Sequence, residues 1–142
     1  MGINCTLFEQ KPDVGGVWRS NYAEFGLQVP WELYEFPGFR YNPDENFDKF
    51  PRGAEVQKYI SRFAKERNIY PSCKFNTAVT SMVPNENGWE VEYKDEKSAQ
   101  KENFDYVVVC TGMYSLPNLP KYPDQEKFKG EVMHAEGFSH GE

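Results

Sequence analysis

Residues 104–112 read Phe-Asp-Tyr-Val-Val-Val-Cys-Thr-Gly and contain the longest aliphatic run in the chain, Val107–Val109. A short apolar run of this kind, without alternation, predicts a strand over 104–110 that is buried on both faces, as is typical of a parallel sheet. The run stops at Thr111-Gly112. Small residues at such a strand end are placed where a ligand meets the sheet. An ordinary strand end followed by a turn is an equally good interpretation.

Shorter elements surround this run. Residues 3–9 predict a short, largely buried strand that ends in an acid. Residues 10–53 show little periodicity and are rich in glycine, proline and aromatic residues, and a stretch this long without regular structure is usually functional. Alternation over 73–83 and again over 89–93 predicts a hairpin, with a turn between the two runs and a second turn at 95–97.

Residues 54–68 form the clearest predicted helix. Its apolar side chains recur at the spacing of one helical face, as a stripe made of Val56, Tyr59, Ile60, Phe63 and Ala64. Asn68 is a suitable C-terminal stop before Pro71.

The order of these elements predicts an α/β, Rossmann-like dinucleotide-binding domain with an inserted β-meander. Such a domain opens with a strand, a glycine-rich turn and a helix before its second strand. We expect this chain to begin at that second strand, with the first β-α unit missing.

The composition limits the possible partners. The net charge of −6 and the pI of about 5.0 argue against a nucleic-acid or anionic-membrane partner. A mean hydropathy of −0.77 indicates a thin aliphatic core, whereas the 16% aromatic content indicates a folded chain. We expect a ligand, a partner or further sequence to complete that core. The three scattered cysteines predict a reducing compartment, the cytoplasm, and no segment reads as a membrane span.

Two motifs near the N-terminus are candidates for chemistry. An acid at the end of the second strand of a dinucleotide fold, here Glu9, accepts hydrogen bonds from ribose hydroxyls. The alternative is a solvated surface glutamate. Gly15-Gly16 followed by Trp18 allows the backbone to approach a cofactor with an aromatic ring beside it. The alternative is a plain turn with a core tryptophan.

Together these features resemble the flavin-containing monooxygenase family from Ile3 to Phe138. The most specific piece is Phe128-x-Gly130-x-x-x-His134-x-x-x-Phe138, which is similar to the identifying signature of that family. The other matching segments are Phe8-Glu9 with Gly15–Trp18, Leu33–Pro37, Tyr59–Ala64 and Val109–Pro120. Related Baeyer–Villiger enzymes usually end the signature in tryptophan, so Phe138 favours the branch that oxidises heteroatoms.

The resemblance implies FAD, NADPH and O₂, with one oxygen atom delivered to a soft nitrogen or sulfur nucleophile of a small-molecule substrate. The cofactor carries this chemistry, so no catalytic side chain and no metal is implied. His134 is implied to be structural rather than a general base. The implied FAD-binding residues are Glu9 at the ribose, Gly16, Val17 and Trp18 at the turn, Gln28 and Val29 beside the isoalloxazine, and Thr111 and Gly112 at the strand end.

Two departures qualify the resemblance. The sequence contains no G-x-G-x-x-G to hold the FAD pyrophosphate. The NADPH-binding domain that the family would place after Phe138 is expected to be absent from residues 1–142. Residues 1–142 are therefore expected to be a partial FAD-binding domain that is inactive alone. The alternative is a non-catalytic remnant or a gene-model fragment that serves as an interaction module. A flavoprotein of the disulfide reductase type is a third option, weakened because no Cys-x-x-Cys is present.

Overall fold

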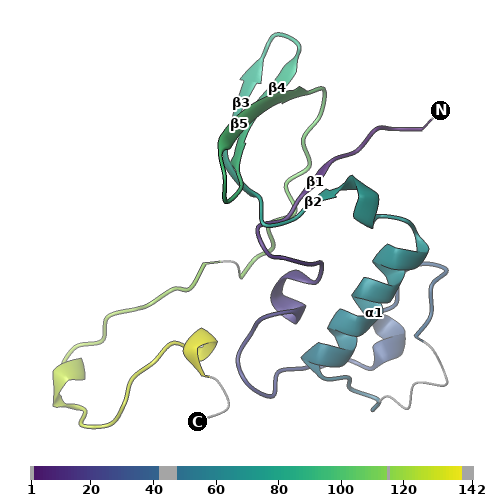
Figure 1. Ribbon diagram of the computed structural model, residues 1–142. Coiled ribbons are helices and arrows are strands. Elements are labelled where there is room, and N and C mark those ends of the chain that lie inside the picture. Colours follow the sequence, from purple (N-terminus) through teal and green to yellow (C-terminus); the bar gives the residue numbers. More distant parts are fainter. Residues whose placement is uncertain (1, 42–47, 115, 139–142) are drawn as a thin grey trace. The chain divides into compact units, whose positions relative to one another are not determined.

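The computed structural model describes residues 2–41, 48–114 and 116–138 (Figure 1). The chain divides into two compact units, and the long helix α1 (Gly53–Glu66) contributes residues to both. Unit 1 comprises residues 1–16 and 57–110, and unit 2 comprises residues 17–56 and 111–142. None of the helices in the described part of the chain has the length and apolar character that crossing a bilayer requires.

A parallel strand pair forms one part of unit 1. Strand β1 (Leu7–Phe8) pairs with β2 (Cys73–Lys74), with Leu7 opposite Cys73. A parallel pair needs a crossover connection, and the chain between the two strands contains α1. This β-α-β order confirms the predicted α/β class at the level of its elements.

The predicted helix is confirmed with a shift of one or two residues. Val56, Tyr59 and Ala64, three members of the predicted stripe, are buried. The helix ends where Asn68 adopts a left-handed φ of 53°. The Asn68 N–H donates to the carbonyl of Lys65, and the Ile69 N–H donates to the carbonyl of Ala64, as in a Schellman cap.

A three-stranded antiparallel meander completes unit 1. Its strands β3 (Ala78–Asn85), β4 (Gly88–Lys94) and β5 (Ala99–Phe104) follow the order β3-β4-β5. The predicted hairpin and both turns are thereby confirmed. Gly88 has a φ of 135°, and a Cβ there would overlap the carbonyl oxygen of Phe104, so only glycine fits this position.

Two predicted strands are wrong or shortened. The run over 104–110 is not a strand: it is irregular after Phe104, and Tyr106 and Val108 are 88% and 82% exposed. The strand predicted over 3–9 is reduced to Leu7–Phe8, and Ile3 is 96% exposed. Among the described residues β2 is the only partner of β1, and the 106–110 run has none. Apolar sequence therefore stays extended there without the ladder hydrogen bonds that define a strand.

Unit 2 has little regular structure, as predicted for residues 10–53. Its described part contains short 3₁₀ turns, η2 (Trp31–Leu33), η4 (Gln125–Lys127) and η5 (Ala135–Gly137). A further turn, η1 (Gly16–Trp18), crosses the boundary between the units along the chain. Buried side chains of unit 2 include Leu27, Phe39, Tyr41, Pro51 and Val56, so aromatic and aliphatic residues share its core.

Candidate functional site

Glu9 lies directly after β1, at the carboxyl end of a parallel strand. Its backbone N–H donates to the carbonyl of Lys74 at 3.0 Å, and its own carbonyl accepts from the Thr77 N–H at 2.9 Å. The half-buried side chain accepts one hydrogen bond, from the Lys11 N–H to Oε1 at 2.8 Å. Within the described residues Oε2 accepts none. The backbone of Glu9 is therefore fixed, while half of its carboxylate is available to a ligand.

The loop after Glu9 is held to other parts of unit 1. Asp13 Oδ1 accepts from the Tyr70 hydroxyl at 2.7 Å and from the Val14 N–H at 2.8 Å. Gln57 Nε2 donates to the Val14 carbonyl at 3.3 Å. The Tyr70 pKa is raised above its ordinary value by burial and then by the hydrogen bond to Asp13. No local motif in the sequence points to these residues, because Asp13 and Tyr70 lie 57 positions apart.

The Gly15-Gly16 pair that follows this loop has the conformations that favour glycine. The φ values are 125° at Gly15 and 53° at Gly16. A Cβ built on Gly16 would meet no atom within 4 Å, so the backbone is open on that side. An open left-handed glycine leaves room for a ligand to approach the backbone closely.

Trp18 is the centre of an aromatic cluster in unit 2. Its ring stacks on Phe25 at 5.8 Å and meets Tyr34 edge-on at 5.3 Å. Its Nε1 donates to the Tyr34 hydroxyl at 2.6 Å. Phe25 in turn contacts Tyr22 at 6.0 Å and covers Gly53, where a Cβ would overlap the Phe25 ring. The orientation of Trp18 is thus set by rings on two sides and by a hydrogen bond.

The remaining predicted site residues are exposed. Val17 is 40% exposed and Val29 39% exposed. Gln28, Thr111 and Gly112 are also exposed, and Gly112 combines a φ of 78° with open space on its Cβ side. Of the predicted set, Glu9 and Gly16 belong to unit 1, and the other six residues belong to unit 2.

The signature segment is folded on itself in unit 2. Phe128 lies over Gly130, where a Cβ would stand 2.6 Å from the ring, so the spacing Phe-x-Gly has a steric reason. His134 Nδ1 accepts from the Glu136 N–H at 3.2 Å and caps the turn η5. The carbonyl of Phe138 accepts from the Ala23 N–H at 2.8 Å. His134 is thus the N-terminal cap of a turn within the signature segment.

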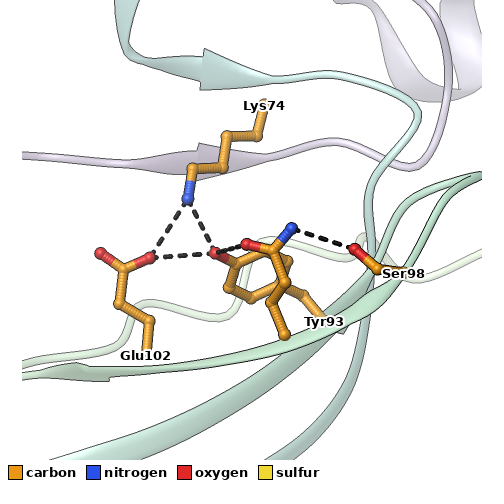
Figure 2. Close-up of polar contacts among 5 residues, drawn as sticks. Lys74, Tyr93, Ser98 and Glu102 are labelled. Atoms are coloured by element: carbon orange, nitrogen blue, oxygen red, sulfur yellow. Dashed lines mark hydrogen bonds and ion pairs between the residues drawn. The ribbon is translucent and has the colours of Figure 1, made fainter.

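A polar cluster in unit 1 joins the parallel pair to the meander (Figure 2). Lys74 Nζ donates to the Tyr93 hydroxyl at 2.9 Å and to Glu102 Oε2 at 3.1 Å. It also lies over the rings of Tyr93 and Phe8, at 4.6 and 5.4 Å from their centroids. The hydrogen bonds from Lys74 to Tyr93 and then to Glu102 raise the Lys74 pKa, against desolvation. The cluster satisfies its own charges and is structural.

The described part of the chain contains three cysteines, and its His, Cys, Asp and Glu side chains are the candidate metal ligands. Cys5, Cys73 and Cys110 are free. Burial, followed by the charges of Glu9 and Asp13, raises the pKa of Cys73, which makes its thiol less reactive. No group of three His, Cys, Asp or Glu side chains with metal-binding geometry occurs over residues 2–41, 48–114 and 116–138.

Comparison with known proteins gives a consistent result. A family model described as flavin-binding monooxygenase-like matches residues 1–142. The chain is 33% identical over 155 residues to trimethylamine monooxygenase of Pelagibacter ubique (strain HTCC1002), covering 95% of this chain and 35% of the relative. It is 32% identical over 154 residues to flavin-containing monooxygenase 3 of Homo sapiens, covering 96% and 29%. The chain thus spans about a third of the length of these curated relatives.

Two solved structures of monooxygenases superimpose on this chain. Tmm from Pelagibacter sp. strain HTCC7211 superimposes with a TM-score of 0.85 at 27% identity, over 98% of this chain and 36% of Tmm. Cyclohexanone monooxygenase from Rhodococcus sp. Phi1, bound to NADP⁺, gives 0.71 at 25% identity, over 99% of this chain and 27% of that chain.

Proposed function

This chain belongs to the flavin-binding monooxygenase-like family, and from that premise we propose that it supplies part of the FAD-binding domain of an NADPH-dependent monooxygenase. The family and the relatives named above are flavin-dependent monooxygenases, that is, oxidoreductases and flavoproteins. We propose further that β1 and β2 belong to a Rossmann-like sheet whose strand ends face the dinucleotide, and that α1 is the crossover helix between them. The observation that carries the proposal is Glu9, which stands at the carboxyl end of a parallel strand with one carboxylate oxygen uncommitted among the described residues.

The residues present fit a flavin dinucleotide. A ribose offers hydroxyl donors, and Glu9 Oε2 is an acceptor at the strand end. The glycines at 16 and 112 leave open space where a Cβ would otherwise stand, so backbone can approach a flat or charged ligand closely. Trp18 presents a ring whose orientation is fixed by Tyr34 and Phe25.

Each of these residues has a binding or orienting part. Glu9 would accept the ribose hydroxyls, Gly16 and Val17 would line the cofactor with backbone, and Trp18 would pack on it. Gln28 and Val29 would lie beside the isoalloxazine, and Thr111 and Gly112 would lie near the cofactor. When bound, FAD supplies the redox and oxygen-activating chemistry, so the protein's contribution is position and exclusion of water.

We propose a nitrogen or sulfur nucleophile as the substrate class. The net reaction takes a tertiary amine, O₂, NADPH and a proton to an amine N-oxide, water and NADP⁺. Two features support this class over ketone oxygenation: Phe138 ends the signature where the ketone-oxidising branch usually has tryptophan, and a relative at 33% identity is named trimethylamine monooxygenase. We also propose the cytoplasm as the compartment, supported by three free cysteines that form no disulfide.

The test is substrate-dependent oxidation of NADPH. The protein is expressed at its full natural length, with residues 1–142 in place. It is supplied with FAD and NADPH, and absorbance at 340 nm is followed with trimethylamine, with a thioether and with cyclohexanone. We expect the amine or the thioether to raise the rate and to yield N-oxide or sulfoxide by mass spectrometry. FAD binding without turnover of any substrate would favour the alternative, a non-catalytic binding module. Turnover of cyclohexanone alone would contradict the proposed substrate class.

A further inference from the structure

We infer that Tyr70 and Asp13 are positioning residues that fix the Gly15-Gly16 turn in the conformation that receives the flavin dinucleotide. The inference rests on the proposed function in one respect, since it takes this turn to be a cofactor-binding turn. That Tyr70 and Asp13 hold the turn is argued from contacts within unit 1 alone.

Asp13 connects the turn to a distant part of the chain. One oxygen, Oδ1, accepts two hydrogen bonds, from the Tyr70 hydroxyl at 2.7 Å and from the Val14 N–H at 2.8 Å. A carboxylate oxygen has acceptor capacity for both. Asp13 therefore links the backbone N–H of Val14 to the hydroxyl of Tyr70.

Val14 is held through its carbonyl as well. Gln57 Nε2 donates to that carbonyl at 3.3 Å and to Ser61 Oγ at 3.0 Å. Gln57 and Ser61 are one turn apart on α1, so the helix holds the amide in place. Both backbone polar groups of Val14 are thus engaged immediately before the two glycines.

Tyr70 is itself held in place by its surroundings. It begins the turn η3 (Tyr70–Ser72) that leads into β2, its ring contacts Phe75 at 5.7 Å, and it is half-buried. A hydrogen bond from a hydroxyl to a carboxylate is among the stronger kinds, and partial burial strengthens it further.

The consequence follows from the freedom of glycine. Two successive glycines have the largest number of backbone conformations to lose when a ligand orders them. A loop that is ordered before binding avoids that loss and binds more tightly. The Tyr70–Asp13 bond, 57 positions apart in sequence, supplies that order without touching the ligand.

The experiment compares Tyr70→Phe with Tyr106→Phe, which loses the same hydroxyl at an exposed position. In the expressed protein that carries residues 1–142, the FAD dissociation constant is measured by equilibrium dialysis. Amide signals of Gly15 and Gly16 are recorded by NMR without ligand, and the unfolding midpoint is recorded for each variant. We expect Tyr70→Phe to shift both glycine signals and to weaken FAD binding about ten-fold, with a lowered unfolding midpoint that still leaves the variant folded under the binding conditions. Tyr106→Phe should leave all three measurements unchanged.

Asp13 variants provide the second test. Asp13→Asn keeps an acceptor oxygen and should weaken binding less than Asp13→Ala. If the two residues act through each other, adding Tyr70→Phe to Asp13→Ala should cause little further loss. Glycine signals and FAD affinity that do not change in Tyr70→Phe would overturn the inference. Failure of the parent protein itself to bind FAD would instead overturn the proposed function, and the glycine signals would still decide whether Tyr70 fixes the turn.

Discussion

The indole Nε1 of Trp18 donates a hydrogen bond to the hydroxyl of Tyr34 at 2.6 Å, and the two rings meet edge-on at 5.3 Å. The two residues are sixteen positions apart in the chain, so this contact joins distant parts of the irregular segment of unit 2. Phe25 stacks on the indole as well, so the orientation of Trp18 is constrained by contacts with two rings. An aromatic residue that is to pack on a flat cofactor needs such an orientation before the ligand arrives.

Tyr34→Phe should therefore destabilise unit 2 modestly. The change leaves the ring in place and removes the acceptor of the Trp18 N–H, at a cost of about 1 kcal/mol. The free energy of unfolding in urea measures the effect. Tyr22→Phe is the matched control, because Tyr22 contacts Phe25 through its ring and no hydrogen bond of its hydroxyl is present in the described part of the chain. Equal losses in both variants would contradict the assignment.

Gly53→Ala should be destabilising although alanine favours helices. The added Cβ would overlap the Phe25 ring, and that ring cannot move freely because Trp18 stacks on it. Overpacking of this kind costs about 1–3 kcal/mol. Gly137→Ala is the control, since a Cβ there meets nothing within 4 Å. The thermal unfolding midpoints of both variants test this expectation. A Gly53→Ala protein as stable as the parent would show that the Phe25 ring moves aside at little cost.

Tyr93→Phe should weaken the attachment of the meander to the parallel pair. Tyr93 is 4% exposed, and its hydroxyl lies between Lys74 Nζ at 2.9 Å and Glu102 Oε2 at 3.1 Å (Figure 2). Removal of a buried hydroxyl with charged partners should cost about 1–3 kcal/mol. Lys101→Ala removes an exposed ion pair with Glu90 and should cost less than about 1 kcal/mol. The urea midpoint of Tyr93→Phe should therefore be lower than that of Lys101→Ala. The reverse order would contradict the account.

Stability should fall at alkaline pH. The pKa values of Cys73, Tyr70 and Lys74 are all raised in the folded chain, from ordinary values of 9.0, 10.0 and 10.5. The unfolded chain then loses these protons first, so the folded state loses stability as the pH rises from about 9 through the raised values. Urea unfolding at pH 8, 9, 10 and 11 measures the slope. Tyr70→Phe should flatten the fall above pH 10, and an identical slope in that variant would show that Tyr70 does not contribute.

Local signals predicted the elements that depend on local chemistry. The α1 stripe, the left-handed stop at Asn68 and the two meander turns all follow from spacing or from turn residues. Strand β5 was missed because its sequence, Ala-Gln-Lys-Glu-Asn-Phe, has no apolar alternation, and it forms because β4 offers an edge to pair with.

Apolar content alone led to a wrong strand prediction over residues 104–110, because a strand also needs a neighbouring strand to pair with. The run Tyr106–Cys110 has the composition of a buried strand, yet a strand requires neighbours that no pattern within the run can supply. The candidate site shows the same limit. The two glycines and Glu9 could be found from their motif, whereas Tyr34 and Tyr70 contribute through contacts across long sequence separations.

The most direct test of the central claim, that this chain binds the ribose of FAD through Glu9, is equilibrium dialysis of FAD against the expressed protein that carries residues 1–142. Glu9→Gln and Glu86→Gln are compared with the parent, since each removes one negative charge and Glu86 lies in the exposed β3–β4 turn. The account predicts saturable binding by the parent, about ten-fold weaker binding by Glu9→Gln, and parental affinity in Glu86→Gln. No saturable binding by the parent, or equal affinity in all three proteins, would contradict it.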